Sequence, residues 1–251
     1  MMQSPSMREA AARLLPLLDL TDLSDTCRSE DIRALVKRAE TPYGPVAAIC
    51  IWQHFVAEAR LALGDAPIKL ATVVNFPEGN EDTQRVVEDT HAVMCDGADE
   101  VDLVMPYRAL MRGDEKIVHD MIAAVRGEMA PEMILKVILE TGILAEAALI
   151  AKASRIAIEA GAHFLKTSTG KTKTGATLPA AETMLHEIKA SGRPVGLKIS
   201  GGIKTLADAM PYLSLAARLM GEDWIKPSTF RIGASALLDD LLATIEASQE
   251  N

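Results

Sequence analysis

Eight short apolar or β-rich runs recur along the chain, and their regular spacing constrains the fold more than any other feature. The runs begin at positions 17, 47, 69, 100, 134, 164, 195 and 229, so successive starts are 22 to 34 residues apart. Between them lie stretches with helical periodicity, for example TQRVVEDTHAVMCDGA and EAALIAKASRIAIEAGA. One strand with its helix takes about 30 residues, so the eight units predict a TIM (β/α)8 barrel. An open doubly wound sheet would usually have fewer strands and often a G-x-G-x-x-G loop, which this sequence lacks.

The sequence contains no obvious boundary between domains. No Gly/Ser-rich or Pro-rich linker and no low-complexity tract interrupts the 251 residues, of which 49% are hydrophobic and 24% are charged. This composition is typical of a globular protein with one large core. We therefore expect a single domain over 1–251, with a helical N-terminal extension at 1–16 and a short C-terminal tail at 243–251.

Charge and cysteine content restrict the partners and the compartment. A net charge of -9 without a basic block argues against nucleic acid as a partner. Arg8, Glu9 and Arg13 precede a short apolar stretch broken by Pro16, so neither a signal peptide nor a membrane span fits the N-terminus. Three cysteines without C-x-x-C spacing indicate reduced thiols. We expect a cytoplasmic protein that does not associate with membranes.

Four consecutive strands carry an ionisable residue within an otherwise mostly apolar run. These residues are Asp102, Lys136, Lys166 and Lys198. Because side chains alternate between the two faces of a strand, all four are predicted to point into the barrel near its catalytic end. A lone strand lysine usually snorkels to water, but three lysines and an aspartate favour a built site. A purely structural ion-pair network is the alternative reading of the same residues.

This set of residues suits Schiff-base catalysis. A lysine amine is a nucleophile only when it is neutral, so its pKa must lie well below the usual value. Lys198 on the neighbouring strand can lower the pKa of Lys166 by repulsion between like charges, and burial adds to this effect. The neutral amine can then condense with a carbonyl, and Asp102 can shuttle the protons that this step requires.

Three glycine-containing segments follow the last three strands and predict a phosphate site. Small residues expose backbone N-H groups there, at the end of the barrel that commonly binds phosphate. The candidate residues are Gly170, Lys171, Gly201, Gly202, Gly233 and Ser235. The five histidines are scattered without metal-ligand spacing, so we expect neither a metal ion nor a cofactor.

Several segments together resemble deoxyribose-phosphate aldolases, a family of class I aldolases. They are FLKTSTGK, GADEVDLVMPYRAL, LKVILETG, ATVVNFPEGN, AAICIW, LKISGGIKT and RIGAS, and the resemblance runs from about Leu17 to about Leu242. It implies a TIM barrel that reversibly cleaves 2-deoxy-D-ribose 5-phosphate to acetaldehyde and D-glyceraldehyde 3-phosphate, in deoxyribonucleoside catabolism.

The resemblance also implies a role for each candidate residue. Lys166 would form the Schiff base, Lys198 would lower its pKa and Asp102 would relay protons. The six phosphate candidates named above would line the phosphate site. Further residues would surround the pocket: Asp19, Thr21, Cys50, Lys136 and Thr169.

Two positions depart from the pattern of the family. Some members carry a second serine in the last motif where this chain has Ala236, which puts one phosphate hydrogen bond in doubt. Some longer members end in a tail with a terminal tyrosine, whereas this chain ends EASQEN. We therefore expect no assistance to proton transfer from a tyrosine in its own tail.

Other functions fit the same residues. A Schiff-base aldolase for longer sugar phosphates, a pyridoxal-phosphate enzyme and a phosphosugar-binding protein without turnover are the alternatives. Assembly is equally open, because Ile150, Ile156 and Ile158 on an outer helix fit either the core or an interface. A homodimer is therefore possible.

Overall fold

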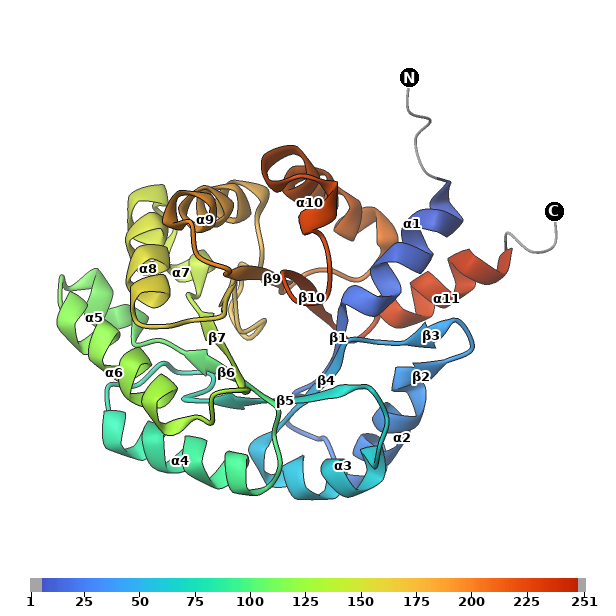
Figure 1. Cartoon of the computed structure of the whole chain (residues 1–251), viewed down its shortest axis with the longest axis horizontal. Helices are drawn as coiled ribbons and strands as arrows, with labels where there is room; N and C mark the ends of the chain where they lie inside the picture. The colour runs from blue at the N-terminus through green and yellow to red at the C-terminus, as the bar shows by residue number, and fades with distance from the viewer. Residues whose placement is uncertain (1–5, 248–251) are drawn as a thin grey trace.

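Eight parallel strands close into a barrel, and helices surround it (Figure 1). A computed structural model describes residues 6–247 of the chain. Around the barrel the strands follow the order β1-β10-β9-β8-β7-β6-β5-β4. Their bounds are β1 Leu18–Asp22, β4 Ala48–Ile51, β5 Lys69–Val74, β6 Glu100–Val104, β7 Ile134–Ile138, β8 Phe164–Lys166, β9 Gly196–Ser200 and β10 Phe230–Ala234. The predicted TIM barrel is confirmed.

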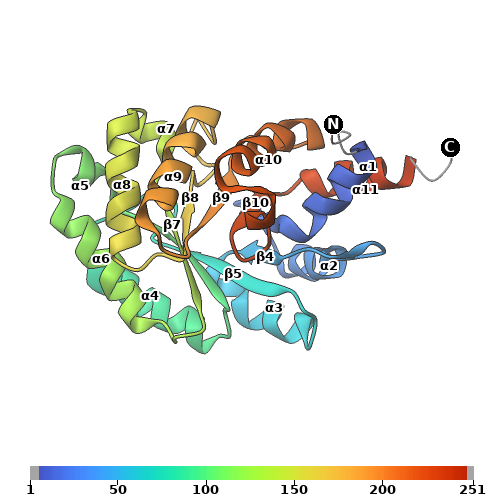
Figure 2. The ribbon, with the colours of Figure 1, turned by 45° about the horizontal axis from the view of Figure 1, so that its top comes forward.

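Helices alternate with these strands and form the outer layer (Figure 2). The α-helices are α1 Met7–Leu14, α2 Ser29–Ala39, α3 Val56–Leu63, α4 Thr83–Cys95, α5 Tyr107–Met111, α6 Glu115–Glu128, α7 Thr141–Leu144, α8 Ala147–Glu159, α9 Leu178–Ser191, α10 Leu206–Met220 and α11 Leu237–Ala247. Short 3-10 helices lie at Leu15–Leu17, Gln53–Phe55 and Glu222–Trp224. A two-stranded hairpin, β2 Glu40–Thr41 and β3 Gly44–Pro45, lies outside the barrel.

Local sequence explains where several helices begin and end. Asp82 caps α4 by accepting a hydrogen bond from the Arg85 N-H, and Thr177 caps α9 in the same way. Gly97 and Gly161 follow α4 and α8 with φ angles of +97° and +101°. Glycine adopts this left-handed region without steric cost, so each turns the chain toward the next strand.

The main core lies between the barrel and the outer helices. One face of each strand packs against apolar helix faces there, and the buried residues form one continuous cluster. Ile150, Ile156 and Ile158 belong to it, with exposed fractions of 3%, 7% and 3%. They are core residues of this chain, which resolves the question that the sequence left open.

The first and last helices of the described residues lie on one side of the barrel, where α1 packs against α11 (Figure 1). The expected N-terminal extension, 1–16, contains α1 and the first two residues of the following 3-10 helix. Of the expected tail, 243–247 forms the end of α11, while 248–251 lies outside the described residues, as does 1–5.

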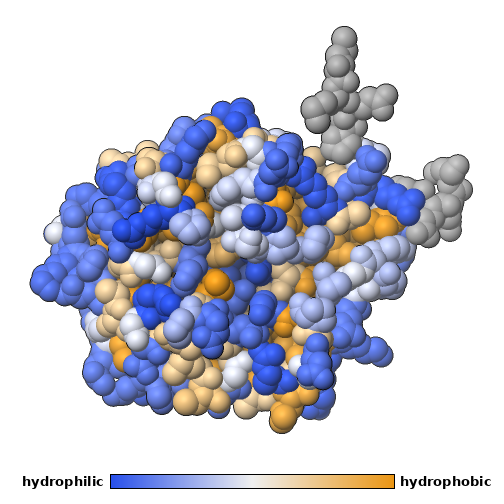
Figure 3. Space-filling model, in the orientation of Figure 1, coloured by the Kyte–Doolittle hydropathy of each residue, from blue (hydrophilic) through white to orange (hydrophobic). Residues whose placement is uncertain are grey.

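The face of the molecule seen in Figure 3 carries mainly hydrophilic residues, with smaller apolar areas between them. The exposed large apolar side chains in 6–247 are spread over several elements: Met7, Leu61, Met111, Ile143 and Leu178. No helix in this part of the chain is both long and apolar enough to span a membrane.

Candidate active site

Lys166 Nζ lies inside the barrel, 2.7 Å from Asp102 Oδ2. Lys198 Nζ lies 2.8 Å from the same carboxylate oxygen, and Lys136 Nζ lies 2.7 Å from the other one. Lys166 and Lys198 are direct partners in the register of β8 and β9, and Asp102 and Lys136 are partners in β6 and β7. Strand pairing thus places three cations around one buried carboxylate.

The pKa of Lys166 is lowered from its usual value. Burial is the largest cause; the Asp102 carboxylate opposes the shift, and the Lys198 ammonium adds to it. Burial also disfavours the charged form of Lys198, but Asp102 and Asp19 outweigh it and raise the pKa of Lys198. The two neighbouring lysines are therefore shifted in opposite directions, so Lys166 is the one that loses its proton more readily.

Asp102 is held in its ionised form. Burial would raise its pKa, but Lys136, Lys166 and Lys198 together lower it well below the usual value. Cys50 lies beside this carboxylate, with its Sγ 4.0 Å from Asp102 Oδ2, and burial raises the pKa of the thiol. At neutral pH the thiol is consequently protonated.

The polar network continues to residues that the sequence reasoning missed. Arg231 Nη1 lies 2.6 Å from Asp19 Oδ1, and Arg231 Nη2 lies 3.2 Å from Glu100 Oε1. Asp19 Oδ2 and Glu100 Oε2 contact Lys198 and Lys136 at 2.6 Å, as ion pairs without hydrogen-bond alignment. Strand alternation could have indicated both residues. Glu100 is two residues from Asp102 on one strand and Arg231 is two residues from Gly233 on another, so each shares a face with a predicted site residue.

A hollow of about 280 Å³ opens above Lys166 at the carboxyl ends of the strands. All six predicted phosphate residues line it: Gly170, Lys171, Gly201, Gly202, Gly233 and Ser235. Gly170, Gly201 and Gly202 have φ angles of +77°, +91° and +89°, which explains why glycine occupies these positions. The hollow thus combines a buried amine with a glycine-lined rim.

Two lysines supply positive charge at this rim. Lys171 Nζ lies 2.8 Å from Asp25 Oδ1 and 5.7 Å from the centre of the Trp52 ring. Lys204, which the sequence reasoning did not single out, also lines the hollow. It follows Gly202 by two residues in SGGIKT, so its position in the glycine segment was the available signal.

Glu140 holds the loop that carries part of this rim. It is buried, has a left-handed φ of +55°, and accepts a 2.6 Å hydrogen bond from the Thr169 hydroxyl. Thr169 Oγ1 accepts in turn from the Lys171 N-H at 3.0 Å. A non-glycine residue at positive φ is strained, and such strain persists where surrounding contacts maintain it. Here those contacts fix the loop.

The expected pocket residues divide into two groups. Thr21 and Thr169 line the hollow. Asp19, Cys50 and Lys136 are fully buried beneath it and do not line it. These three residues contact Asp102 or Lys198 instead, so they can influence a ligand in the hollow only through those side chains.

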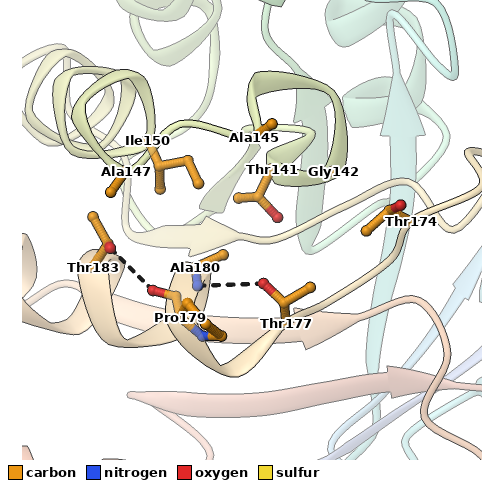
Figure 4. Close-up of a pocket in the computed structure, with 10 residues that line it drawn as sticks. All are labelled: Thr141, Gly142, Ala145, Ala147, Ile150, Thr174, Thr177, Pro179, Ala180 and Thr183. Carbon is orange, nitrogen blue, oxygen red and sulfur yellow. Dashed lines mark hydrogen bonds between the residues drawn. The ribbon is translucent and has the colours of Figure 1, made fainter.

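A second hollow of about 280 Å³ lies between α7, α8 and α9 (Figure 4). Four threonines and small or aliphatic residues line it, with no charged side chain among them. The hydroxyls of Thr177 and Thr183 bond to the backbone of α9 at Ala180 and Pro179. Without a cation or a nucleophile, this hollow does not suit an anionic carbonyl substrate, so the candidate active site is the hollow above Lys166.

Fold and site together define a class: a TIM barrel with a buried amine of lowered pKa at its catalytic end, beneath a glycine-lined rim that carries lysines. The sequence profile of the DeoC/LacD family aldolases matches residues 13–243. The chain belongs to this family of aldolases, which confirms the resemblance seen in its motifs.

Individual relatives agree with the family match. The chain is 54% identical over 243 residues to a deoxyribose-phosphate aldolase from Agrobacterium fabrum, covering 96% of this chain and 94% of that protein. Crystal structures provisionally described as deoxyribose-phosphate aldolases are similar too. One from Coccidioides immitis has a TM-score of 0.83 and 29% identity, covering 96% of this chain and 88% of that one. One from Toxoplasma gondii has a TM-score of 0.88 and 26% identity, covering 96% and 98%.

Proposed function

We propose that this aldolase reversibly cleaves 2-deoxy-D-ribose 5-phosphate to acetaldehyde and D-glyceraldehyde 3-phosphate through a Schiff base on Lys166. The observation that carries the proposal is the position of Lys166, whose Nζ lies 2.7 Å from Asp102 Oδ2 and which pairs with Lys198 beneath the glycine-lined rim; burial there lowers the pKa of Lys166. The 54% identity to a deoxyribose-phosphate aldolase supports the choice of substrate.

In this mechanism the neutral Lys166 amine attacks the aldehyde carbon C1 of the open-chain sugar. Loss of water from the carbinolamine leaves an iminium ion. The C2–C3 bond then breaks, its electron pair forms an enamine with the iminium, and the C3 hydroxyl loses its proton to become the aldehyde of glyceraldehyde 3-phosphate. Protonation of the enamine at C2 and hydrolysis release acetaldehyde and restore the amine.

Asp102 serves as the proton relay in this proposal. Its Oδ2 accepts hydrogen bonds from both Lys166 and Lys198, at 2.7 Å and 2.8 Å, so it connects the reacting amine with a second ammonium group. Because the surrounding cations lower the pKa of Asp102, it can hold a proton only transiently. Lys198 remains charged and keeps the pKa of Lys166 low.

The phosphate group is assigned to the rim of the hollow. In this proposal Gly170, Gly201, Gly202, Gly233 and Ser235 surround its oxygens, and Lys171 supplies positive charge; the support is that all of them line the hollow. Lys204 is a second cation on the same rim. With Ala236 in the last motif, the cradle has one hydroxyl fewer than the serine-containing members of the family.

The decisive experiment is incubation with acetaldehyde and borohydride, followed by peptide mass mapping. We expect an ethyl group on Lys166, and no such group in the Lys166→Ala variant, which should also lose turnover. Lys152→Ala is a matched control, because Lys152 is exposed and pairs with Glu115 on the outer surface. A folded wild-type protein without an adduct would mean that the buried charges are structural or bind another carbonyl.

Substrate identity is tested separately from the Schiff base. Cleavage of 2-deoxy-D-ribose 5-phosphate should give glyceraldehyde 3-phosphate, and 2-deoxyribose without phosphate should react with a much higher KM. Turnover only with longer sugar phosphates would support a different aldolase. An absorption band in the visible range would instead point to a pyridoxal-phosphate enzyme.

Location and assembly are also proposed. We infer a cytoplasmic protein, supported by three free cysteines, Cys27, Cys50 and Cys95, which suit a reducing compartment. A homodimer no longer draws support from the three outer-helix isoleucines, because they are buried in the chain's own core. It rests on exposed apolar side chains such as Leu61, which is 86% exposed. Light scattering after gel filtration would give the oligomeric state directly.

A further inference from the structure

Six buried side chains form a closed ring in which positive and negative charges alternate. The ring runs from Arg231 to Asp19, Lys198, Asp102, Lys136, Glu100 and back to Arg231. Every neighbouring pair is joined by an N···O distance between 2.6 and 3.2 Å. Five of the eight barrel strands contribute to it, namely β1, β6, β7, β9 and β10.

Formal charge in this ring balances without Lys166. Its three cations and three carboxylates cancel, and Lys166 is attached from outside through Asp102 Oδ2. A buried site disfavours net charge, because desolvating an uncompensated ion costs more than desolvating a balanced set. The ring and Lys166 together are neutral when Lys166 is a neutral amine, and they carry one excess positive charge when Lys166 is protonated.

Arg231 and Glu100 close the ring on the side away from the hollow. Neither lines the hollow above Lys166; both instead line a separate cavity of about 440 Å³, together with Pro16, Pro45 and Lys69. Three of the five N-H donors of the Arg231 guanidinium are engaged within the protein, because Nε donates to the Pro227 carbonyl while Nη1 and Nη2 donate to Asp19 and Glu100. Each of these contacts is to a group of the protein itself, and both side chains of the pair lie away from the hollow above Lys166.

We propose that Arg231 and Glu100 are positioning residues for catalysis, because they hold Asp19 and Lys136 in the ring and balance the charge that Lys166 faces. This inference rests on the proposed Schiff-base function of Lys166. Its consequence is that residues at the closed side of the barrel set the protonation of an amine at the open side, without contacting the substrate.

Several charged or titratable groups influence the protonation of Lys166, and a test must distinguish their effects. Asp102 contacts it from β6, Lys198 from β9, and the Cys50 thiol on β4 adds a weaker electrostatic influence. Lys136, Asp19, Arg231 and Glu100 act from the rest of the ring. Removing a cation from the ring leaves a negative excess and should favour protonated Lys166, whereas removing a carboxylate should favour the neutral amine.

Two single variants should shift the pH midpoint of Lys166 modification in opposite directions, and the double variant should cancel the two shifts. In Arg231→Gln, the pH midpoint of reductive ethylation of Lys166 by acetaldehyde and cyanoborohydride should move upward by about one unit. In Glu100→Gln the midpoint should move downward. The double variant Arg231→Gln/Glu100→Gln removes one charge of each sign and should return the midpoint toward wild type. Arg218→Gln is the matched control, because Arg218 pairs with Glu182 at the exposed surface, and it should cause no shift.

Circular dichroism accompanies each measurement, so that loss of folding is recognised. If Arg231→Gln does not fold, the Glu100→Gln and double variants still test the sign of the effect. Shifts in the same direction, or unchanged midpoints in folded variants, would overturn the inference. Absence of ethylation in the wild-type protein would instead overturn the proposed function, so the two failures are distinguishable.

Discussion

The interior of the barrel has two unlike regions, which we call the charged half and the apolar half although they comprise six strands and two strands. On β6 to β10 and β1, ionisable side chains fill it and compensate one another. On β4 and β5, Cys50, Ala71 and Val73 form a separate buried apolar cluster with Leu23. The register pairs Cys50 with Ala71 and Val73 with Asp102, so the apolar wall directly adjoins the central carboxylate.

This contrast indicates a division of labour around Lys166. The apolar wall contributes to the desolvation that lowers the pKa of Lys166, while the charged half determines how much net charge the amine experiences. The edge-to-face pair of Trp52 and Phe76, with ring centres 5.4 Å apart, packs on the apolar wall. Changes in the charged half should therefore alter protonation, and changes in the apolar half should alter mainly packing.

The largest effect is expected from Lys198→Leu in the charged half. Loss of the ammonium removes a repulsion that lowers the pKa of Lys166, so the pH at which the Schiff base forms should rise. We expect kcat/KM at neutral pH to fall by about 10²-fold or more. The pH profile of kcat/KM and of borohydride trapping would measure both, with the exposed Lys152→Leu as control. An unchanged profile would contradict the role of Lys198.

Acid should destabilise the charged half specifically. Asp102 has a folded-state pKa well below the usual value, so its unfolded form binds a proton first as pH falls. The stability that it contributes is present above about pH 4 and is lost as pH falls through the folded pKa. When the unfolded state binds one proton more than the folded state, the free energy of unfolding changes by about 1.4 kcal/mol per pH unit. Denaturant unfolding at several acidic pH values gives the free energy of unfolding as a function of pH. This dependence on pH should be shallower for Asp102→Asn than for wild type, and equal dependences would refute this account.

Val73→Ala tests the apolar half. Val73 is fully buried, and the truncation leaves a cavity that should lower the free energy of unfolding by about 2 kcal/mol. Since alanine keeps this wall apolar and the substitution changes no charge, the pH midpoint of Schiff-base trapping should stay within a few tenths of a unit of wild type. A large shift of that midpoint would show that the two halves are not separable in this way.

The smallest effect is expected at the rim, from Gly201→Ala. An added Cβ would lie 2.4 Å from Ser168 Oγ at a backbone φ of +91°, so the glycine segment must shift. We expect KM for the phosphorylated substrate to rise by about tenfold while the trapping of acetaldehyde, which has no phosphate, stays near wild type. Gly113→Ala is a suitable control, because it shares the positive φ but meets no neighbouring atom within 4 Å. Equal losses for the phosphorylated substrate and for acetaldehyde would argue against a role of Gly201 in binding phosphate.

Strand periodicity explains how much of the site was predictable. The parity of Asp102, Lys136, Lys166 and Lys198 correctly indicated inward side chains, because alternation along a strand is a local property. Ring closure was not predictable in this way. Arg231 and Asp19 are 212 residues apart in sequence, and their 2.6 Å contact arises only when β10 pairs with β1 to close the barrel.

The spacing of strands and helices, the helix caps, the glycine turns and the inward parity of the lysines follow from local sequence, because each depends on residues close together in the chain. The position of Asp19, Cys50 and Lys136 beneath the hollow rather than on it arises from the packing of distant strands. The same packing brings three carboxylates and three cations together around Lys166, where they compensate one another. Charge balance in a buried site depends on distances between strands that are distant in sequence, and closure of the barrel sets those distances.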